Sequence, residues 1–234
     1  MTSGKTRAYH HGDLRRALIE EGFRAARTGG PDAVTLREVT RAVGVSPNAA
    51  YRHFADRGEL VRAAAAQAQL ALAQAISDRL DTAPTGLSAH DASVERLRLL
   101  GLGYIDFARR ERGWFELAFT VHDQTPSDAI VTLDDEVVEP FRLLLDALDA
   151  MVAAGALAPE RRPHAEWACW SAVHGFADIA VHGPLQWQPP AVVDALAGAV
   201  VDAAIAGVRG APSPATPPES RPTGAGEVKS IGRI

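Results

Sequence analysis

The side chains with the clearest chemical use lie close together in the first quarter of the chain, and that use is recognition. Asn48 can pair with the edge of an adenine, and Ala49 can contact a thymine methyl group. Tyr51, Arg52 and His53 follow directly, and each of them can meet a phosphate. The segment therefore offers candidate contacts to double-stranded DNA. The alternative to a DNA contact, for each of these side chains, is the role of an ordinary solvated surface residue.

Three further polar side chains belong with this group. Thr35 and Ser46 are hydroxyl residues at predicted helix starts, where free backbone N–H groups also favour a phosphate. Capping of the helix is an adequate alternative role for both hydroxyls. Arg37 falls in the first turn of the first of these helices, which would place it near the edge of a major groove.

Two short helices are needed to position these residues. Thr35 and Glu38 form a T-x-x-E capping box, which predicts a helix beginning at Leu36. Val39 recurs at helical spacing on the same face, and Gly44 can adopt the positive φ that ends such a helix.

A second helix is predicted over residues 47–53. Ser46 is its N-cap, and Pro47 occupies the first helical position, where its missing N–H costs nothing. Asp56 and Glu59 then form a second capping box, which starts a third helix. Two short helices around a glycine-containing turn are the helix-turn-helix pattern, although an ordinary helical hairpin in a bundle shares it.

Residues 10–65 resemble the TetR family of transcriptional regulators. The resemblance is carried by the run VTLREVTRAVGVS and by the run AAYRHFADRGEL. Thr40 and Val43 depart from the alanines usual in the family, and Gly58 departs from its usual glutamate. The resemblance implies that Tyr51, His53 and Arg57 contact phosphates.

The expected fold class is all-α, with a three-helix DNA-binding head on a helical body and about nine helices in total. Abundant alanine and few aromatic residues favour helices over sheets. The expected organisation is a flexible basic arm (1–12), the helix-turn-helix domain (13–55), a connecting helix (56–80), a ligand-binding and dimerisation domain (81–209) and a disordered tail (210–234). We expect Asp13 to cap the first helix, over residues 13–27.

Composition narrows the class of protein further. The chain has 234 residues, and 47% of them are hydrophobic, which is ample for a packed core. Cys169 is the single cysteine, so the chain can form neither an intrachain disulfide nor a cysteine-based zinc site. The most apolar stretch, residues 191–208, contains Asp194 and Asp202, which favours a buried helix over a membrane span. With a polar N-terminus, these features predict a cytoplasmic protein.

The overall net charge of −5 conceals an asymmetry. Residues 1–65 contain 11 basic and 7 acidic side chains, whereas the remainder contains 13 basic and 22 acidic ones. A basic head of net charge +4 on a body of net charge −9 suits a DNA contact made by one end of the molecule.

The body contains aromatic residues that could line a pocket for a small apolar or aromatic molecule. Aromatic side chains with one or two polar groups are typical of such pockets, although an ordinary core is equally compatible with each residue. The candidates are Tyr104, Trp114, Phe115, Phe119, Phe141, Trp167, Trp170 and His174. The segment 170–176 also resembles one TetR subgroup, in which a Trp/His/Gly element lies in this helix.

One short reading helix contacts few bases, so a symmetric dimer on a pseudo-palindromic operator is expected. The last two helices, over residues 164–182 and 190–208, are the candidate dimer surface because their small residues permit close packing. Those residues are Ala195, Ala197, Gly198, Ala199, Ala203 and Ala204. In the family these two helices form a four-helix bundle between subunits.

No catalytic or cofactor motif is present, so we expect neither an enzyme nor a bound cofactor or metal. Gly101-Leu102-Gly103 lacks the third glycine of a dinucleotide fingerprint, and His10-His11 has no third ligand nearby. His174 and Asp178 could meet as a ligand pair, but a hydrogen-bonded core histidine is the favoured alternative.

The sequence therefore predicts a homodimeric, TetR-like repressor that a small apolar or aromatic ligand releases from DNA. The alternative is a helical ligand-binding or interaction protein that no longer reads DNA.

Overall fold

The computed structural model describes residues 11–120 and 139–210, and these residues form α-helices and short 3-10 helices with no β-strand. The α-helices are α1 (His11–Gly29), α2 (Leu36–Val43), α3 (Pro47–Ala50), α4 (Arg57–Leu80), α5 (Ala89–Arg110), α6 (Arg112–Thr120), α7 (Glu139–Ala153), α8 (Ala165–Val181) and α9 (Pro190–Gly210). The all-α fold predicted from the sequence is confirmed.

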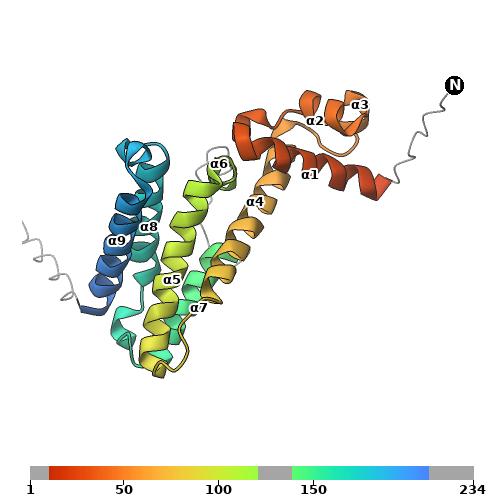
Figure 1. The fold of residues 1–234 in the computed structure, drawn as a ribbon. Helices are drawn as coiled ribbons and strands as arrows, with labels where there is room; N and C mark the ends of the chain where they lie inside the picture. The colour runs from red at the N-terminus through yellow and green to blue at the C-terminus, as the bar shows by residue number, and fades with distance from the viewer. Residues whose placement is uncertain (1–10, 121–138, 211–234) are drawn as a thin grey trace, which may run out of the picture.

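Helices α1 to α3 form the head, which lies at one end of the molecule in Figure 1. Their hydrophobic core includes Leu18, Val39, Ala50 and Phe54, each with an exposed fraction of 1% or less. Helix α1 begins at His11, so Asp13 lies inside its first turn and is not the cap that we expected. The helix extends upstream of this residue, which leaves no cap position for it.

Helix α4 connects the head to the body. The Asp56 side chain accepts a hydrogen bond of 2.8 Å from the Glu59 backbone N–H, which caps the start of the helix as predicted. Its 24 residues extend over about 36 Å at 1.5 Å per residue. Leu60 packs in the core of the head and Ile76 packs in the core of the body, so α4 is anchored in both cores.

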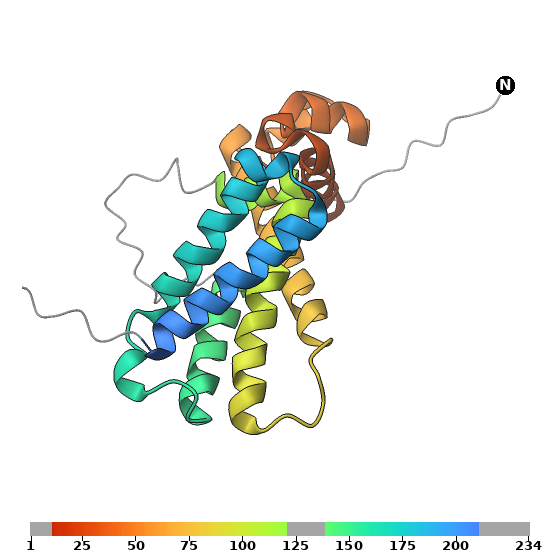
Figure 2. The same ribbon diagram turned by 60° about the vertical axis from the view of Figure 1, so that its left-hand side comes forward.

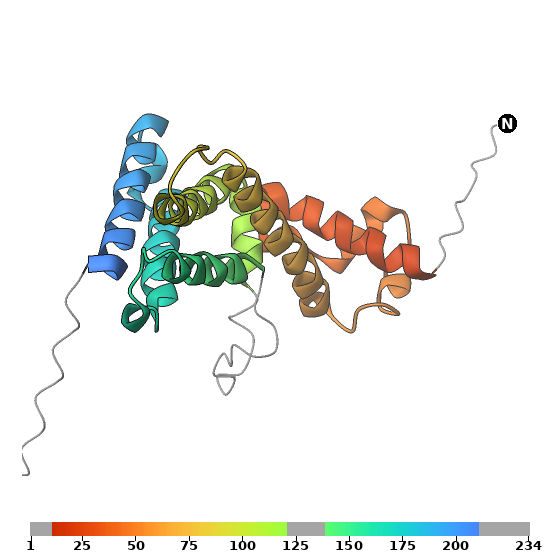
Figure 3. The same cartoon turned by 90° about the horizontal axis from the view of Figure 1, so that it is seen from below.

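The body is a layered bundle in which α5 lies between α4 and α7 on one side and α8 and α9 on the other (Figure 1). Helices α8 and α9 run side by side on the outer surface, joined by a 3-10 turn, η4 (Pro184–Trp187) (Figure 2). Viewed from below, they lie on the opposite side of the molecule from the head (Figure 3).

Helix α6 belongs to both cores. Its Leu117 and Ala118 are fully buried in the core of the head, whereas Phe115 is buried in that of the body. A single residue, Glu111, separates α5 from α6, so the two helices are nearly continuous. The head is therefore completed by two further helices, α4 and α6.

Parts of the predicted organisation lie outside the described residues. These are residues 1–10 of the arm, residues 121–138 within the ligand-binding and dimerisation domain, and residues 211–234 of the tail. Helix α7 starts next to Pro140, which the first turn of a helix tolerates well.

Among the described residues, α9 is the one helix long and apolar enough to meet the length and composition criteria for a membrane span. Its Val193, Val201 and Ile205 are buried against the rest of the body. Asp202 accepts a hydrogen bond of 2.8 Å from Arg98 of α5. One face of α9 is therefore packed on the body, while the rest of the helix lies on the outer surface and is not buried as predicted.

Candidate functional sites

The helix-turn-helix is stabilised mainly by local hydrogen bonds. The Thr35 hydroxyl accepts a bond of 3.2 Å from the Glu38 backbone N–H, so its expected capping role is confirmed. Gly44 ends α2 with a φ of 80°, and its N–H donates to the Thr40 carbonyl at 2.9 Å. The Thr40 hydroxyl is buried and donates to the Leu36 carbonyl, which accommodates this departure from the family alanine.

Helix α3 is shorter than predicted, because it ends at Ala50 and continues as a turn through His53. The N–H groups of His53 and Phe54 both donate to the Ala50 carbonyl, at 2.8 and 3.0 Å. This tightening directs Phe54 into the core, where its exposed fraction is 1%. Tertiary burial of one ring thus sets the length of α3.

The candidate DNA contacts lie together on and around this turn. Arg37, Ser46, Pro47, Asn48, Tyr51, Arg52 and Arg57 are exposed, while Thr35, Ala49 and His53 are half-buried. Tyr51 is 57% exposed, which is unusual for a large aromatic ring. The Ser46 hydroxyl makes no capping bond although Ser46 stands at the N-cap position of α3. Figure 1 shows α2 and α3 at the far end of the head, away from the body helices.

Arg57 has an internal role that the sequence did not reveal. Its Nε and Nη2 atoms donate to the carbonyls of Val34 and Pro31, at 2.8 and 2.6 Å. Asp32 lies 3.6 Å away. The side chain therefore fastens the start of α4 to the connection between α1 and α2, and only part of its guanidinium faces outward.

Six of the eight candidate pocket residues form one aromatic cluster in the body. Ring centroids of neighbouring members lie 4.9 to 6.2 Å apart, most of them in edge-to-face or tilted arrangements. The members are Tyr104, Phe115, Phe119, Phe141, Trp170 and His174. They come from α5, α6, α7 and α8, so the tertiary structure alone brings them together.

A single hydrogen bond links two polar groups inside this cluster. The Tyr104 hydroxyl lies 2.6 Å from His174 Nδ1. Burial raises the pKa of Tyr104 and lowers the pKa of His174, the latter in part opposed by Asp178. Both groups are thus neutral near pH 7, and His174 is the hydrogen-bonded core histidine that the sequence favoured.

Of the other two aromatic candidates, Trp167 lies at the edge of the cluster and Trp114 lies elsewhere. Trp114 stacks on Phe23 of α1, with ring centroids 4.2 Å apart, and its Nε1–H donates to the Phe23 carbonyl at 2.7 Å. Arg27 lies 4.8 Å above the Trp114 ring. Trp167 contacts Phe141 at the edge of the cluster and is 43% exposed. Trp114 is thus placed at the joint between head and body and not in a pocket.

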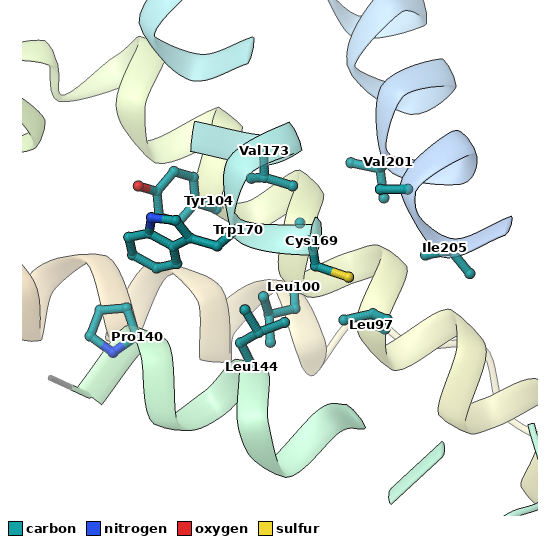
Figure 4. A pocket seen from close by; sticks show the side chains of 12 residues that line it. Leu97, Leu100, Tyr104, Pro140, Leu144, Cys169, Trp170, Val173, Val201 and Ile205 are labelled. Atoms are coloured by element: carbon teal, nitrogen blue, oxygen red, sulfur yellow. The ribbon is translucent and has the colours of Figure 1, made fainter. Parts of the chain in front are cut away.

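A small cavity of about 30 Å³ lies beside the aromatic cluster, between α5, α7, α8 and α9. Two of the predicted residues, Tyr104 and Trp170, line it. The remaining walls are Leu97, Leu100, Gly101, Pro140, Leu144, Cys169, Val173, Val201, Ala204 and Ile205 (Figure 4). These residues were not predicted, because nothing in the sequence distinguishes them from ordinary core positions. The spacing of Leu97, Leu100 and Tyr104 on one helical face was the one available signal.

Helix α6 separates the aromatic cluster from the head. At its start, Gly113 approaches α1 so closely that an added Cβ would lie 2.0 Å from the Ala26 carbonyl oxygen. Glu111 accepts two hydrogen bonds from Arg27, at 2.6 and 2.7 Å. Because Phe115 and Phe119 on the same helix contact the Tyr104 ring, displacement of the cluster would press directly on this joint.

The described residues contain no group of three or more side chains suited to hold a metal ion. His174 and Asp178 do not meet as a ligand pair, since Asp178 bonds His182 at 2.8 Å instead. Cys169 is buried, and burial raises the pKa of its thiol to about 11.

Two family models match this chain. Residues 16–64 match the model of bacterial regulatory proteins of the TetR family, and residues 97–204 match that of a tetracyclin repressor-like C-terminal domain. A search of curated protein sequences returned no significant match.

Solved structures show the same fold. A protein of unknown function from Rhodococcus sp. RHA1 is 26% identical with a TM-score of 0.66, over 87% of this chain and 100% of that one. A transcriptional regulator from the same organism is 20% identical with a TM-score of 0.55, over 85% and 99%. PfmR, a TetR family regulator from Thermus thermophilus, is 18% identical with a TM-score of 0.51, over 80% and 96%. With both family models matched across head and body, this chain is a member of the TetR family of transcriptional regulators.

Proposed function

We propose that the protein is a homodimeric repressor that binds a pseudo-palindromic operator in the cytoplasm and is released by a small apolar or aromatic effector. Its activity is binding and release, with no catalysed reaction and no cofactor. The observation that carries the proposal is the exposure of Asn48 and Tyr51 on the outward side of α3 and of the turn that follows it.

The proposed contacts divide into two classes. Asn48 and Ala49, with the first turn of α3, would meet base edges in the major groove. Tyr51, Arg52 and His53 would meet phosphates, together with Ser46 and Pro47 at the start of α3 and Thr35, Arg37 and the outward part of Arg57 nearby. Phosphate contacts position the head and base contacts give the sequence preference.

The exposed face of α8 and α9 supports dimer formation. Five large apolar side chains remain exposed on these helices and the turn between them, namely Trp167, Ile179, Trp187, Val192 and Leu196. Trp187 is 81% exposed, and several exposed apolar side chains on one surface are typical of a protein interaction site. The exposed alanines at 195, 199 and 203 leave room for a second helix to approach closely. A second copy of the same face is the proposed occupant.

Helix α6 supplies a route from effector to DNA. An effector that enlarges the aromatic cluster would push Phe115 and Phe119, and α6 would transmit that displacement to α1 through Gly113 and Trp114. In a dimer this would change the spacing of the two heads. The effector therefore shifts the population away from the arrangement that fits two successive major grooves.

A mobility-shift assay with the DNA upstream of the protein's own gene tests DNA binding. Asn48→Ala should weaken binding by about 1–3 kcal/mol and relax the base preference. Arg52→Ala should weaken binding on all sequences alike. Gln74→Ala and Arg96→Ala are matched controls, because both residues are exposed on helices of the body. Undiminished binding by both variants would remove Asn48 and Arg52 from the DNA contacts, whereas no binding by the unaltered protein would favour the alternative of a protein that no longer reads DNA.

Light scattering after gel filtration tests the dimer. Leu196→Glu places a charge in the proposed interface and should yield monomers. Leu70→Glu changes a leucine on α4 that is at least as exposed, and it should leave the dimer intact. Equal masses for the two variants would remove α9 from the interface.

A further inference from the structure

We propose that the cavity beside the aromatic cluster selects neutral ligands that carry an apolar body and one hydrogen-bonding group, and that Tyr104 and His174 recognise that group. This inference rests on the proposed role of the cluster as the effector site. It adds the chemical class of the effector and the two residues that determine it.

The first argument is charge. The twelve residues that line the cavity are leucine, isoleucine, valine, alanine, glycine, proline, cysteine, tyrosine and tryptophan, and none of them is ionised near pH 7. A carboxylate or an ammonium group placed there would lose its hydration without gaining a counter-charge. The cavity therefore discriminates against ions of either sign.

The second argument is the size of the cavity. At about 30 Å³ it is much smaller than the roughly 150 Å³ of a cavity known to hold benzene, so a ligand must enlarge it. Trp170 is the largest side chain that lines the cavity, and it stacks on His174 with ring centroids 5.7 Å apart. A shift of Trp170 therefore displaces the imidazole as well.

The third argument follows from that displacement. Moving His174 away from Tyr104 would break the 2.6 Å hydrogen bond and leave the buried Tyr104 hydroxyl and the half-buried imidazole without this partner. A ligand hydroxyl inserted between them can donate to His174 Nδ1 and accept from the Tyr104 hydroxyl. An ethyl or methyl group in the same place cannot, so the pocket favours a single polar group at this position.

The arrangement of the walls indicates how such a ligand lies. In Figure 4 the Tyr104 hydroxyl and the indole nitrogen of Trp170 lie on the same side of the pocket, away from Leu97 and Ile205. The aliphatic end would take the apolar body, and the polar group would point toward Tyr104 and His174.

Isothermal titration calorimetry at about pH 7.5 with four probes of similar size tests the proposal. We expect 4-ethylphenol to bind about 3- to 10-fold more tightly than ethylbenzene, the gain of one neutral hydrogen bond. We expect 4-ethylbenzoate and 4-ethylbenzylamine to bind at least about 100-fold more weakly than 4-ethylphenol. Equal affinity for either ion and the phenol, or no binding by any probe, would overturn the proposal.

The double variant Tyr104→Phe/His174→Phe keeps both rings and removes both polar groups. It should bind ethylbenzene as the unaltered protein does and lose the preference for 4-ethylphenol. Tyr51→Phe removes the hydroxyl of an exposed tyrosine on the head and is the matched control. A preference that survives in the double variant would show that other groups recognise the hydroxyl. The discrimination against ions is measured on the unaltered protein, so it is tested even if the double variant does not fold.

The mobility-shift assay separates this proposal from the proposed function. A protein that binds 4-ethylphenol selectively but does not release DNA would support the ligand class and contradict release by that effector. A protein that binds DNA but none of the probes would contradict only the ligand class.

Discussion

The helix-turn-helix and the aromatic cluster are built in opposite ways. The helix-turn-helix is a hairpin of α2 and α3. This hairpin is held by caps and turns between residues at most five positions apart, such as Thr35 with Glu38 and Gly44 with Thr40. The cluster is assembled from four helices, and its one polar pair joins residues 70 positions apart. Local bonding leaves the side chains of the hairpin free to face outward, whereas tertiary packing turns the polar groups of the cluster inward.

The difference shows which contacts each region depends on for its structure. The hairpin depends on the rest of the chain at Phe54 and Arg57, which attach it to the packed head. The cluster depends on α6, which also completes the core of the head. Changes at these attachments should therefore act on both regions, while changes at exposed hairpin residues should act on one.

Phe54→Ala should have the largest effect. It removes a fully buried ring from the core of the head, which costs about 3–5 kcal/mol of unfolding free energy. Tyr51→Ala, three residues earlier and exposed, should change stability by less than about 0.5 kcal/mol while weakening DNA binding. Chemical denaturation measures the unfolding free energy of both variants. A similar loss of stability in the two variants would show that Tyr51 is a structural residue.

Gly113→Ala should damage the joint between α1 and α6. The new methyl group would overlap the Ala26 carbonyl, and overpacking of this kind costs about 1–3 kcal/mol. Gly175→Ala is the matched control, because it lies within a helix with open space at the Cβ position. That control should be neutral or slightly stabilising. Thermal unfolding measures the melting temperatures of Gly113→Ala and Gly175→Ala. Equal melting temperatures would mean that α6 can shift freely against α1.

Arg57→Lys separates a structural role from a phosphate contact. Lysine keeps the charge but cannot reproduce the forked donation to Val34 and Pro31, so stability should fall by about 1–2 kcal/mol. Arg52→Lys, on an exposed side chain, should leave stability unchanged. If Arg57→Lys alters DNA affinity and not the unfolding free energy, the hydrogen bonds to the two carbonyls contribute little to stability.

The smallest effect concerns pH. His182 lies 2.8 Å from both Glu116 and Asp178, and the hydrogen bond to Glu116 is the main reason that its pKa is raised. The stability contributed by the charged imidazole is fully present below the ordinary histidine pKa of about 6.5 and is lost as pH rises through the raised value. His182→Gln should therefore lower the melting temperature at about pH 6 and have little effect at about pH 9. A difference in melting temperature between His182→Gln and the unaltered protein that stays constant with pH would show that the effect comes from packing.

The head could be predicted from the sequence almost completely. The capping boxes at Thr35 and Asp56 and the glycine at position 44 define the start and end of their helices within a few residues. The length of α3 was predicted wrongly because the burial of Phe54 ends the helix at Ala50. In the body most of the aromatic residues do gather, but Trp114 packs against the head instead of joining them.

What the sequence determined by itself was therefore most of the features governed by neighbouring residues, such as the caps at Thr35 and Asp56 and the turn at Gly44. What only the tertiary structure decided was which apolar faces meet. Trp114 and Phe115 are adjacent in the sequence, yet one packs on Phe23 in the head and the other lies beside Tyr104 in the body. Successive residues of a helix point about 100° apart, so a helix between two cores sends neighbouring side chains to different partners, and those partners are set by contacts across the whole chain.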